Sequence, residues 1–330
     1  MLSRQCRPTG DDTAKSFAGR RRSSLQAASD ALALQHPIRL NCRAGVYSRK
    51  LSELRLSITI PGGFRFAEST DAFTFRLHLL MNVLILAAGY ATRLYPLTEN
   101  RAKPLLDVAG KPMIEWVLDN LAPIPDISAV YVVTNDKFAR DFETWAEGYA
   151  KSQPKVKFKI INDGSRSDAD KLGAIGDIRL VLDRAELTNE PLIVVAGDNL
   201  FSEPLTEFAA HAKGSAATLA TYDVGDLEAM KKYSAIRTDA EGVITHFEEK
   251  PAKPETTLTG IALYYFAPET LELFTTYIAA GNNPDQPGRF IQWLYTRQPV
   301  KTYQIKGTWY DIGSKETLEE ANKIFAKFRK

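Results

Sequence analysis

Cysteine is nearly absent from this 330-residue sequence, and both cysteines, Cys6 and Cys42, precede residue 50. The rest of the chain therefore has no material for a disulfide framework or a thiolate metal site. Histidine is scarce as well, and its four occurrences are scattered rather than grouped at metal-ligand spacing: His36, His78, His211 and His246. This pattern argues against a histidine metal centre and against histidine-based catalysis.

The sequence also lacks an apolar run of about 20 residues, the length needed to cross a bilayer. The apolar stretch Leu77–Ala88 follows Arg76 and imitates the core of a signal peptide. It is too short to span a membrane, and it lies far from the N-terminus, where signal peptides begin. A buried parallel strand explains this stretch better. We therefore expect a cytoplasmic protein without a membrane partner.

Charge is nearly balanced but unevenly distributed. The formal net charge is +2, yet residues 1–80 contain 13 Lys and Arg against 6 Asp and Glu, and the remaining residues contain 29 against 34. Nucleic-acid binding usually needs a basic surface, so the mildly acidic body argues against a nucleic-acid partner. With 44% hydrophobic and 25% charged residues, the composition is that of a globular protein.

Residues 1–80 differ from the rest of the chain. They include Arg20–Arg22 and Ser23–Ser24, few acidic residues, and no sustained helical or alternating period. Three interpretations stay open: a transit-like leader rich in Arg and Ser, a disordered interaction tail, or a segment that is not translated, with Met81 as the natural start. We favour the third, because a strand pattern begins immediately after Met81.

Strand and helix patterns alternate from Asn82 onward. The expected strands are 82–87, 129–134, 156–161 and 191–196, and the expected helices are 113–121, 138–149 and 175–187. This rhythm predicts an α/β fold, with a Rossmann-like, mainly parallel mixed sheet and helices on both faces. Four further strand-like segments are expected to extend the sheet and to build a small β-rich lid: 217–222, 234–237, 243–248 and 257–266. Helices are expected again at 269–278, 289–297 and 315–328.

A loop of small residues follows the first strand. It spans residues 88–98 and contains Ala88, Gly89 and Arg93. Small residues at the carboxyl end of a strand let a phosphate approach backbone N–H groups closely, and open α/β sheets bind ligands at that edge. The planar guanidinium of Arg93 suits phosphate oxygens. An ordinary tight turn would look the same in isolation.

The residues that continue this loop favour a phosphate-binding loop over an ordinary tight turn. The run from Leu86 to Met113 resembles the signature of sugar-phosphate nucleotidyltransferases of the glucose-1-phosphate thymidylyltransferase and mannose-1-phosphate guanylyltransferase type. Their pattern is L-A-A-G-x-G-T-R-L-x-P-L-T, followed by P-K-P-L-L-x-V-x-G-K-P-M. It is not a Walker A loop, because no G-K-[ST] opens a helix. The resemblance implies nucleotide contacts from Leu86, Ala87, Ala88, Gly89 and Thr92, with Arg93 and Lys103 as the catalytic cations.

The sequence departs from the family pattern at three positions. Ala91 replaces the second loop glycine, and its methyl group is tolerated without strain unless its φ is positive. Ala102 replaces a proline before Lys103, and Ser234 replaces a glycine of the sugar pocket.

Two aspartates lie in fragments that match the same family. Asp198 follows the strand-like segment 191–196, and Asp311 lies much later in the chain. Either could be a turn or cap residue by itself, but the resemblance implies that they are the two metal-binding aspartates. Hard carboxylate oxygens suit Mg²⁺, which is therefore the expected cofactor.

The resemblance also assigns the side of the sugar phosphate. Asn199 and Glu249 match residues that bind sugar hydroxyls, Lys250 matches the residue that holds the phosphate, and Thr259 and Gly260 match the lining of the sugar pocket. Without the resemblance, Glu249 and Lys250 would be interpreted as a solvated charge cluster. Gly260 would be interpreted as a β-bulge glycine.

The segment around Gly173 matches the region that contacts the base. We expect the missing side chain of Gly173 to let the base stack closely. The segment is intermediate between pyrimidine-selecting and guanine-selecting patterns, so the identity of the base stays open. Asp177 is typical of an acidic residue in the first turn of a helix.

Taken together, the resemblance implies a nucleotidyltransferase domain at 81–330, with a nucleotide-binding part, 81–214, and a sugar-binding part, 215–330. The implied reaction transfers a nucleoside monophosphate from an NTP to a sugar 1-phosphate by in-line displacement and releases pyrophosphate. NTP and sugar 1-phosphate are the expected partners, and a homo-oligomer is compatible with the sequence. Two alternatives stay open: a phosphocholine-type cytidylyltransferase, and a non-catalytic regulatory subunit that binds a sugar nucleotide.

Overall fold

The computed structural model describes residues 80–153 and 156–328, all within the compact unit Phe73–Lys330. The three interpretations of residues 1–80 concern a segment that, apart from Leu80, lies outside the described residues. In the described ranges, no helix combines the length and the apolar character that a membrane span requires.

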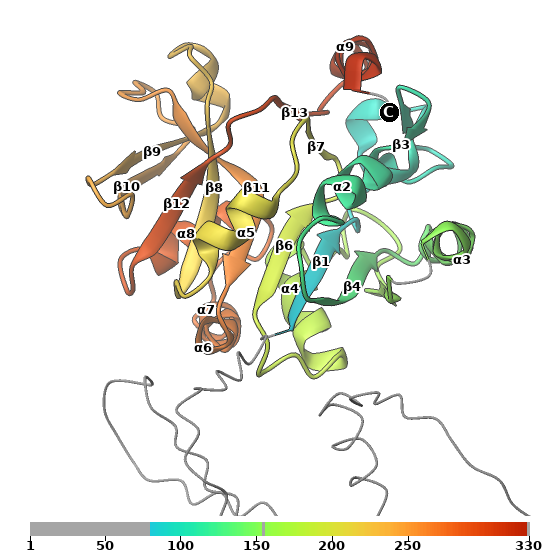
Figure 1. Cartoon of the computed structure of the whole chain (residues 1–330), viewed down its shortest axis with the longest axis horizontal. Coiled ribbons are helices and arrows are strands. Elements are labelled where there is room, and N and C mark those ends of the chain that lie inside the picture. Colours follow the sequence, from blue (N-terminus) through green and yellow to red (C-terminus); the bar gives the residue numbers. More distant parts are fainter. Residues whose placement is uncertain (1–79, 154–155, 329–330) are drawn as a thin grey trace, which may run out of the picture. The chain divides into compact units, whose positions relative to one another are not determined.

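Seven strands form the central sheet, in the order β12-β8-β11-β6-β1-β4-β5 (Figure 1). In that order their bounds are Val300–Gln304, Ala217–Asp223, Leu258–Phe266, Leu192–Ala196, Met81–Leu86, Ile127–Thr134 and Phe158–Asn162. Strand β1 lies between β4 and β6 and is parallel to both. Only β11 runs against its neighbours in this sheet. The expected mainly parallel mixed sheet is thus confirmed.

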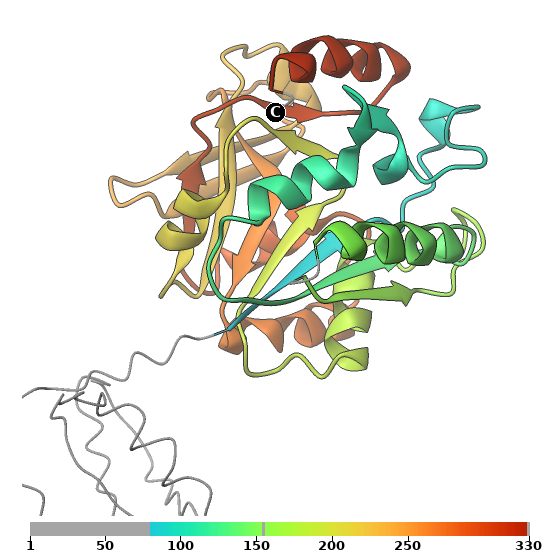
Figure 2. The ribbon, with the colours of Figure 1, turned by 45° about the vertical axis from the view of Figure 1, so that its right-hand side comes forward.

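Helices cover both faces of the sheet, as Figure 2 shows. Side chains of β1 alternate between the two faces: Val83 and Ile85 pack in one core cluster, and Leu84 packs in the other. The first cluster is covered by α2 (Met113–Leu121), α3 (Ala139–Ser152) and α5 (Thr206–Ala212). The second is covered by α4 (Ala174–Arg184), α6 (Pro268–Leu271), α7 (Leu273–Ala279) and α8 (Pro287–Leu294). Burial on both faces explains why β1 is apolar from Val83 to Leu86.

A separate antiparallel pair, β9 (Ser234–Thr238) and β10 (Ile244–Glu249), corresponds to the β-rich part expected after residue 214. Its apolar residues Ile236, Ile244 and Phe247 belong to the second core cluster. The hairpin is therefore anchored on the main body and carries Glu249 at the end of β10.

Two short ribbons and the last helix complete the carboxyl side of the sheet. β2 (Asp107–Val108) pairs with β3 (Lys111–Pro112), and β7 (Asn199–Phe201) pairs with β13 (Trp309–Asp311). Helix α9 (Lys315–Phe325) starts at Ser314, which forms a capping box with Thr317. A third apolar cluster joins α9 to α2 and to the loop after β1; it includes Leu94, Met113, Trp116, Ile312 and Phe325.

The expected elements differ from the structure in a few places. The expected helix 269–278 is two helices, α6 and α7. Helix α5, edge strand β12 and the β7–β13 ribbon were not expected. They are short, and β12 is polar and half-exposed, so that their sequences carry little periodic signal.

Candidate functional site

The small-residue loop begins where three parallel strands end together. The backbone N–H of Ala87 donates to the carbonyl of Val133 at 2.9 Å, and that of Gly197 donates to the carbonyl of Leu86 at 2.9 Å. The Asn135 amide donates to the carbonyl of Ala88 at 2.9 Å. These bonds fix the predicted nucleotide-contacting residues 86–88 at the carboxyl edge of the sheet.

The next part of the loop opens to solvent. Gly89 is exposed, and no atom lies within 4 Å of the position that a Cβ would take. Thr92 and Arg93 begin the short 3-10 helix η1 (Thr92–Leu94), and both are exposed. The loop therefore leaves space in front of its backbone for a ligand such as a phosphate group.

Ala91 adopts the left-handed conformation, with φ 48° and ψ 43°. Its carbonyl accepts hydrogen bonds from the Thr98 hydroxyl at 2.8 Å and from the Leu94 N–H at 3.0 Å. These bonds hold the residue in that conformation, in which a Cβ is disfavoured by about 1–2 kcal/mol. The φ of Ala91 is therefore positive, which is the conformation in which its methyl group was expected to cause strain.

Replacing Ala91 by glycine is expected to stabilise the protein by about 1 kcal/mol, because glycine adopts positive φ without a steric penalty. The check is urea unfolding at equilibrium. Ala102 has φ −61° and is fully buried, so Ala102→Gly should instead destabilise the protein. Loss of stability in Ala91→Gly would show that its methyl group contributes packing that outweighs the strain.

Lys103 and Asp198 form an ion pair across the edge of the sheet. Lys103 begins η2 (Lys103–Leu105), and its Nζ lies 2.6 Å from Asp198 Oδ2. The side chains of Lys103 and Asp198 are 12% and 27% exposed. Burial works to raise the pKa of Asp198, but the charge and hydrogen bond of Lys103, together with a hydrogen bond from Asn199, hold that pKa below its ordinary value. Asp198 is therefore an anion at neutral pH.

The second aspartate reaches the same place through the β7–β13 ribbon. Asp311 pairs in register with Asn199, the residue next to Asp198. Desolvation in the site, followed by the negative charge of Asp198, raises the pKa of Asp311, whereas Lys103 and Arg93 act to lower it. Asp311 is nevertheless exposed at the end of β13, where the strand pairing places it opposite Asn199 and next to the Lys103–Asp198 ion pair.

These two carboxylates fit a divalent cation. No group of three or more His, Cys, Asp and Glu side chains suited to metal binding occurs in the described residues. Asp198 and Asp311 offer hard oxygen donors whose mutual repulsion a cation would relieve. A pair of carboxylates suits Mg²⁺, which commonly takes only one or two from the protein and completes its shell with water and phosphate.

A cavity of about 320 Å³ adjoins the aspartates. Four predicted residues line it: Asn199, Glu249, Gly260 and Asp311. Ser234, which replaces a glycine of the family's sugar pocket, lines it as well. The remaining lining residues were not singled out from the sequence: Lys232, Tyr233, Ile261, Ala262, Tyr264, Gln286, Gly288 and Trp309. Among them Tyr233 and Trp309 stand near motif residues Ser234 and Asp311 in the sequence, and this proximity was the only available signal.

Two predicted sugar-side residues stand outside that lining. Thr259 is fully buried behind the cavity, and its hydroxyl lies 3.4 Å from that of Ser234. Lys250 is exposed beyond the end of β10, with φ 49°. The structure therefore places Thr259 as a support for Ser234, and Lys250 is an exposed residue outside the cavity lining.

Gly260 has a structural explanation as well as a place in the cavity. A Cβ there would lie 2.9 Å from terminal methyl groups of Ile236 and Leu219, and the register of β11 shifts just after it. The N–H of Gly260 donates to Ser234 Oγ at 3.3 Å. The bulge-glycine interpretation thus agrees with the structure, and Ser234 uses an N–H that would otherwise face the cavity.

Gly173 is closed off by its own chain. It has φ 78°, and a Cβ would lie 2.7 Å from backbone atoms of both Pro284 and Asp285. The N–H groups of Ala174 and Ile175 donate to the carbonyls of these two residues. Close packing of this segment accounts for the glycine, and the structure does not bring Gly173 into the cavity.

Asp177 lies in the first turn of α4, as expected, and it is buried. It is 5% exposed, and its Oδ1 has no hydrogen-bond partner among the described residues. Burial, followed by the neighbouring Asp163 carboxylate, raises the pKa of Asp177 from 3.8 to about 8. Because the folded state holds this proton more tightly than the unfolded state, stability should fall as pH rises from about 4 to about 8.

Asp177→Asn is expected to stabilise the protein by about 2 kcal/mol at pH 8 and to have little effect near pH 4, because asparagine needs no proton to stay neutral. Urea unfolding of both proteins between pH 4 and pH 8 measures the difference. Asp183→Asn, an exposed site on the same helix, is the control. A difference that does not change with pH would contradict the assignment of the buried proton to Asp177.

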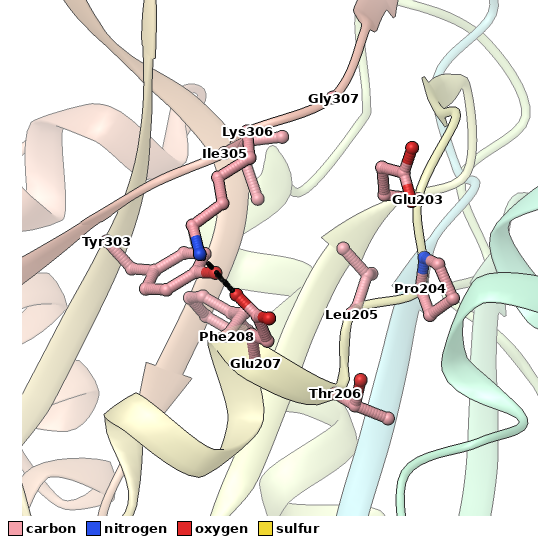
Figure 3. Close-up of a pocket in the computed structure, with 10 residues that line it drawn as sticks. All are labelled: Glu203, Pro204, Leu205, Thr206, Glu207, Phe208, Tyr303, Ile305, Lys306 and Gly307. Atoms are coloured by element: carbon pink, nitrogen blue, oxygen red, sulfur yellow. Dashed lines mark hydrogen bonds and ion pairs between the residues drawn. The ribbon is translucent and has the colours of Figure 1, made fainter.

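A second cavity, of about 430 Å³, contains none of the predicted site residues (Figure 3). It lies between the start of α5 and the end of β12. There the Lys306 ammonium and the Tyr303 hydroxyl donate to Glu207 at 2.8 and 2.9 Å. The Lys306 and Glu207 charges are paired with each other, and the described residues that line this cavity form no cluster of cations and carboxylates comparable to the aspartate site.

Several known proteins are similar to this chain in sequence. The bifunctional protein GlmU of Methanocaldococcus jannaschii is 27% identical over 243 residues, which are 74% of this chain and 54% of that protein. UTP–glucose-1-phosphate uridylyltransferase of Synechocystis sp. is 28% identical over 242 residues, which are 71% of this chain and 60% of that protein. The chain thus spans little more than half the length of these curated relatives.

Among solved structures, UDP-glucose pyrophosphorylase complexed with UDP-glucose aligns with a TM-score of 0.63 and 27% identity. The alignment covers 76% of this chain and all of that one. Residues 82–327 match the family model for nucleotidyl transferases. Since that match extends over well more than half of the chain, the protein belongs to the nucleotidyl transferase family.

Proposed function

We propose that this protein transfers a nucleoside monophosphate from an NTP to a sugar 1-phosphate and releases pyrophosphate. The observation that carries the proposal is the ion pair of Lys103 with Asp198 beside a polar cavity that Asn199 and Asp311 line. The similarity to UDP-glucose pyrophosphorylase supports a sugar nucleotide as the product.

The proposed reaction is an in-line displacement. An oxygen of the sugar phosphate forms a bond to the α-phosphorus of the NTP, while the bond from that phosphorus to the bridging oxygen breaks and pyrophosphate leaves with the electron pair. The attacking phosphate is already an anion, so no side chain has to remove a proton. Binding, orientation and charge neutralisation then supply most of the rate enhancement.

The chain's own groups divide this work. The loop of residues 86–92 binds the triphosphate through backbone N–H groups, and the Arg93 guanidinium neutralises its oxygens. Lys103 keeps Asp198 ionised and adds a second positive charge at the reacting phosphorus.

Asp198 and Asp311 would hold a divalent cation, which we propose to be Mg²⁺. When bound, such an ion neutralises the negative charge that develops on the phosphate oxygens.

The cavity of about 320 Å³ would hold the sugar. Glu249 accepts hydrogen bonds from sugar hydroxyls there, and Lys250 binds the sugar phosphate. This arrangement assigns nucleotide binding to 81–214 and sugar binding to 215–330. We also propose that the reaction takes place in the cytoplasm; a body without cysteine suits that compartment.

The test is pyrophosphate release from each of the NTPs combined with a panel of sugar 1-phosphates, with Mg²⁺ and with EDTA. One preferred pair that depends on the metal ion is expected. Turnover only with CTP and phosphocholine would support the cytidylyltransferase alternative. Tight binding of a sugar nucleotide without turnover of any pair would support the regulatory subunit.

A further inference from the structure

Asn199 and Trp309 form a hydrogen bond between segments 110 residues apart. The Trp309 Nε1–H donates to Asn199 Oδ1 at 2.7 Å. In the β7–β13 ribbon Trp309 pairs with Phe201, and Asp311 pairs with Asn199. Since side chains alternate along each strand, Trp309 and Asp311 share one face of the ribbon with Asn199. The bond is therefore a diagonal cross-strand contact next to the aspartates.

This contact decides which way the Asn199 amide points. An indole N–H can only donate, so the amide must present its oxygen to Trp309 and its NH₂ group elsewhere. That NH₂ group donates to Asp198 Oδ1 at 3.1 Å, while Lys103 donates to Asp198 Oδ2 at 2.6 Å. Both carboxylate oxygens of Asp198 are thus held, one of them through a chain that begins at Trp309.

The indole is itself held in place by aromatic neighbours. Its ring centroid lies 5.4 Å from that of Tyr222 and 6.0 Å from that of Tyr233. Asn199 is 4% exposed, so little water reaches its amide to replace a lost partner. Without the indole N–H, the amide oxygen is free to turn towards the Asp198 carboxylate, which it would repel.

We propose that Trp309 is a positioning residue: it orients the Asn199 amide, and that amide holds the Asp198 carboxylate in the orientation that binds the divalent cation. The inference rests on the proposed function only where Asp198 is taken as a cation ligand. It also changes the predicted role of Asn199, whose NH₂ group has one N–H left for a sugar hydroxyl after the bond to Asp198.

The experiment is a titration of the full chain with Mn²⁺ alone, followed by electron paramagnetic resonance. Trp309→Phe keeps the aromatic packing and removes the N–H donor, and it should weaken Mn²⁺ binding about tenfold, as expected for loss of an outer partner of a ligand. Trp145→Phe is a matched control, because Trp145 of α3 donates its Nε1–H to Glu115 of α2 at 2.9 Å and does not line the cavity. That control should bind Mn²⁺ like the wild type.

Asn199→Ala tests the same link from its other end and should cause a similar loss, even if Trp309→Phe does not fold. Adding Trp309→Phe to Asn199→Ala should change Mn²⁺ binding less than about twofold, because the link is already broken. In turnover, Trp309→Phe should raise the apparent KM for Mg²⁺ and leave the KM for sugar 1-phosphate within about twofold.

Three results would overturn the inference: wild-type Mn²⁺ affinity in Trp309→Phe, additive losses in the double variant, or no binding of Mn²⁺ by the wild type. A rise confined to the KM for sugar 1-phosphate would also overturn it, since Trp309 would then contact the sugar directly. Failure of every substrate pair in the turnover assay, with Mn²⁺ affinities as expected, would contradict the proposed reaction and leave the role of Trp309 intact.

Discussion

Asp198→Asn is expected to lower turnover about a thousandfold, because it removes one of the two carboxylates proposed to hold the cation and leaves the Lys103 charge without its partner. The amide has nearly the same shape, so the fold should persist. Loss of the partly open ion pair should lower the unfolding temperature by only a few degrees. Pyrophosphate release at saturating Mg²⁺ and calorimetric unfolding measure the two effects.

The matched control for this substitution is Asp119→Asn. Asp119 also pairs with a lysine, Lys111, but it lies exposed on α2. Turnover in this variant should stay within about twofold of the wild type. If Asp198→Asn retained a tenth or more of the wild-type turnover, Asp198 would not be a ligand needed for the reaction.

Arg93→Ala is expected to lower turnover about a hundredfold without measurable change in stability. The side chain is exposed in a surface loop and makes no hydrogen bond or ion pair to any other described residue. Its removal therefore loses no packing. The expected loss of turnover comes from the proposed neutralisation of the triphosphate charge by Arg93. Steady-state kinetics with the preferred NTP measure the loss.

Arg101→Ala serves as the comparison for Arg93→Ala. Arg101 is exposed a short distance along the same segment, and it forms a surface ion pair with Asp107 at 3.3 Å. Such pairs contribute about 0–1 kcal/mol, and no role in catalysis is expected for this one. Equal losses in the two variants would indicate a general effect of positive charge near the loop rather than a specific contact by Arg93.

Local patterns predicted the central part of the fold well. Helix α2 occupies the expected residues, Met113–Leu121, and β1 and β6 lie within one residue of their expected bounds. These elements have strong periodicity or continuous apolar character, because they are buried on one or both faces. Edge strand β12 carries no such signal, since only Val300 among its residues is fully buried.

The candidate site could be predicted from the sequence only in part. A motif indicated the aspartates, but their meeting depends on the pairing of β7 with β13, which no local pattern contains. The role of Trp309 depends on that pairing as well. The sequence could not show the conformation of Ala91, because a positive φ is imposed there by hydrogen bonds from Thr98 and Leu94.

The docking of α9 has a consequence for when the protein becomes competent during synthesis. The third apolar cluster joins this last helix to the loop after the first strand, and Ala109 N–H donates to Asn322 at 2.8 Å. Asp311 immediately precedes this helix in the chain. A nascent polypeptide can assemble much of the parallel sheet while translation continues. It cannot bring Asp311 beside Asn199 and Asp198 until the segment that forms β13 and α9 has left the ribosome, so the proposed cation site is completed after the parallel sheet that supports it.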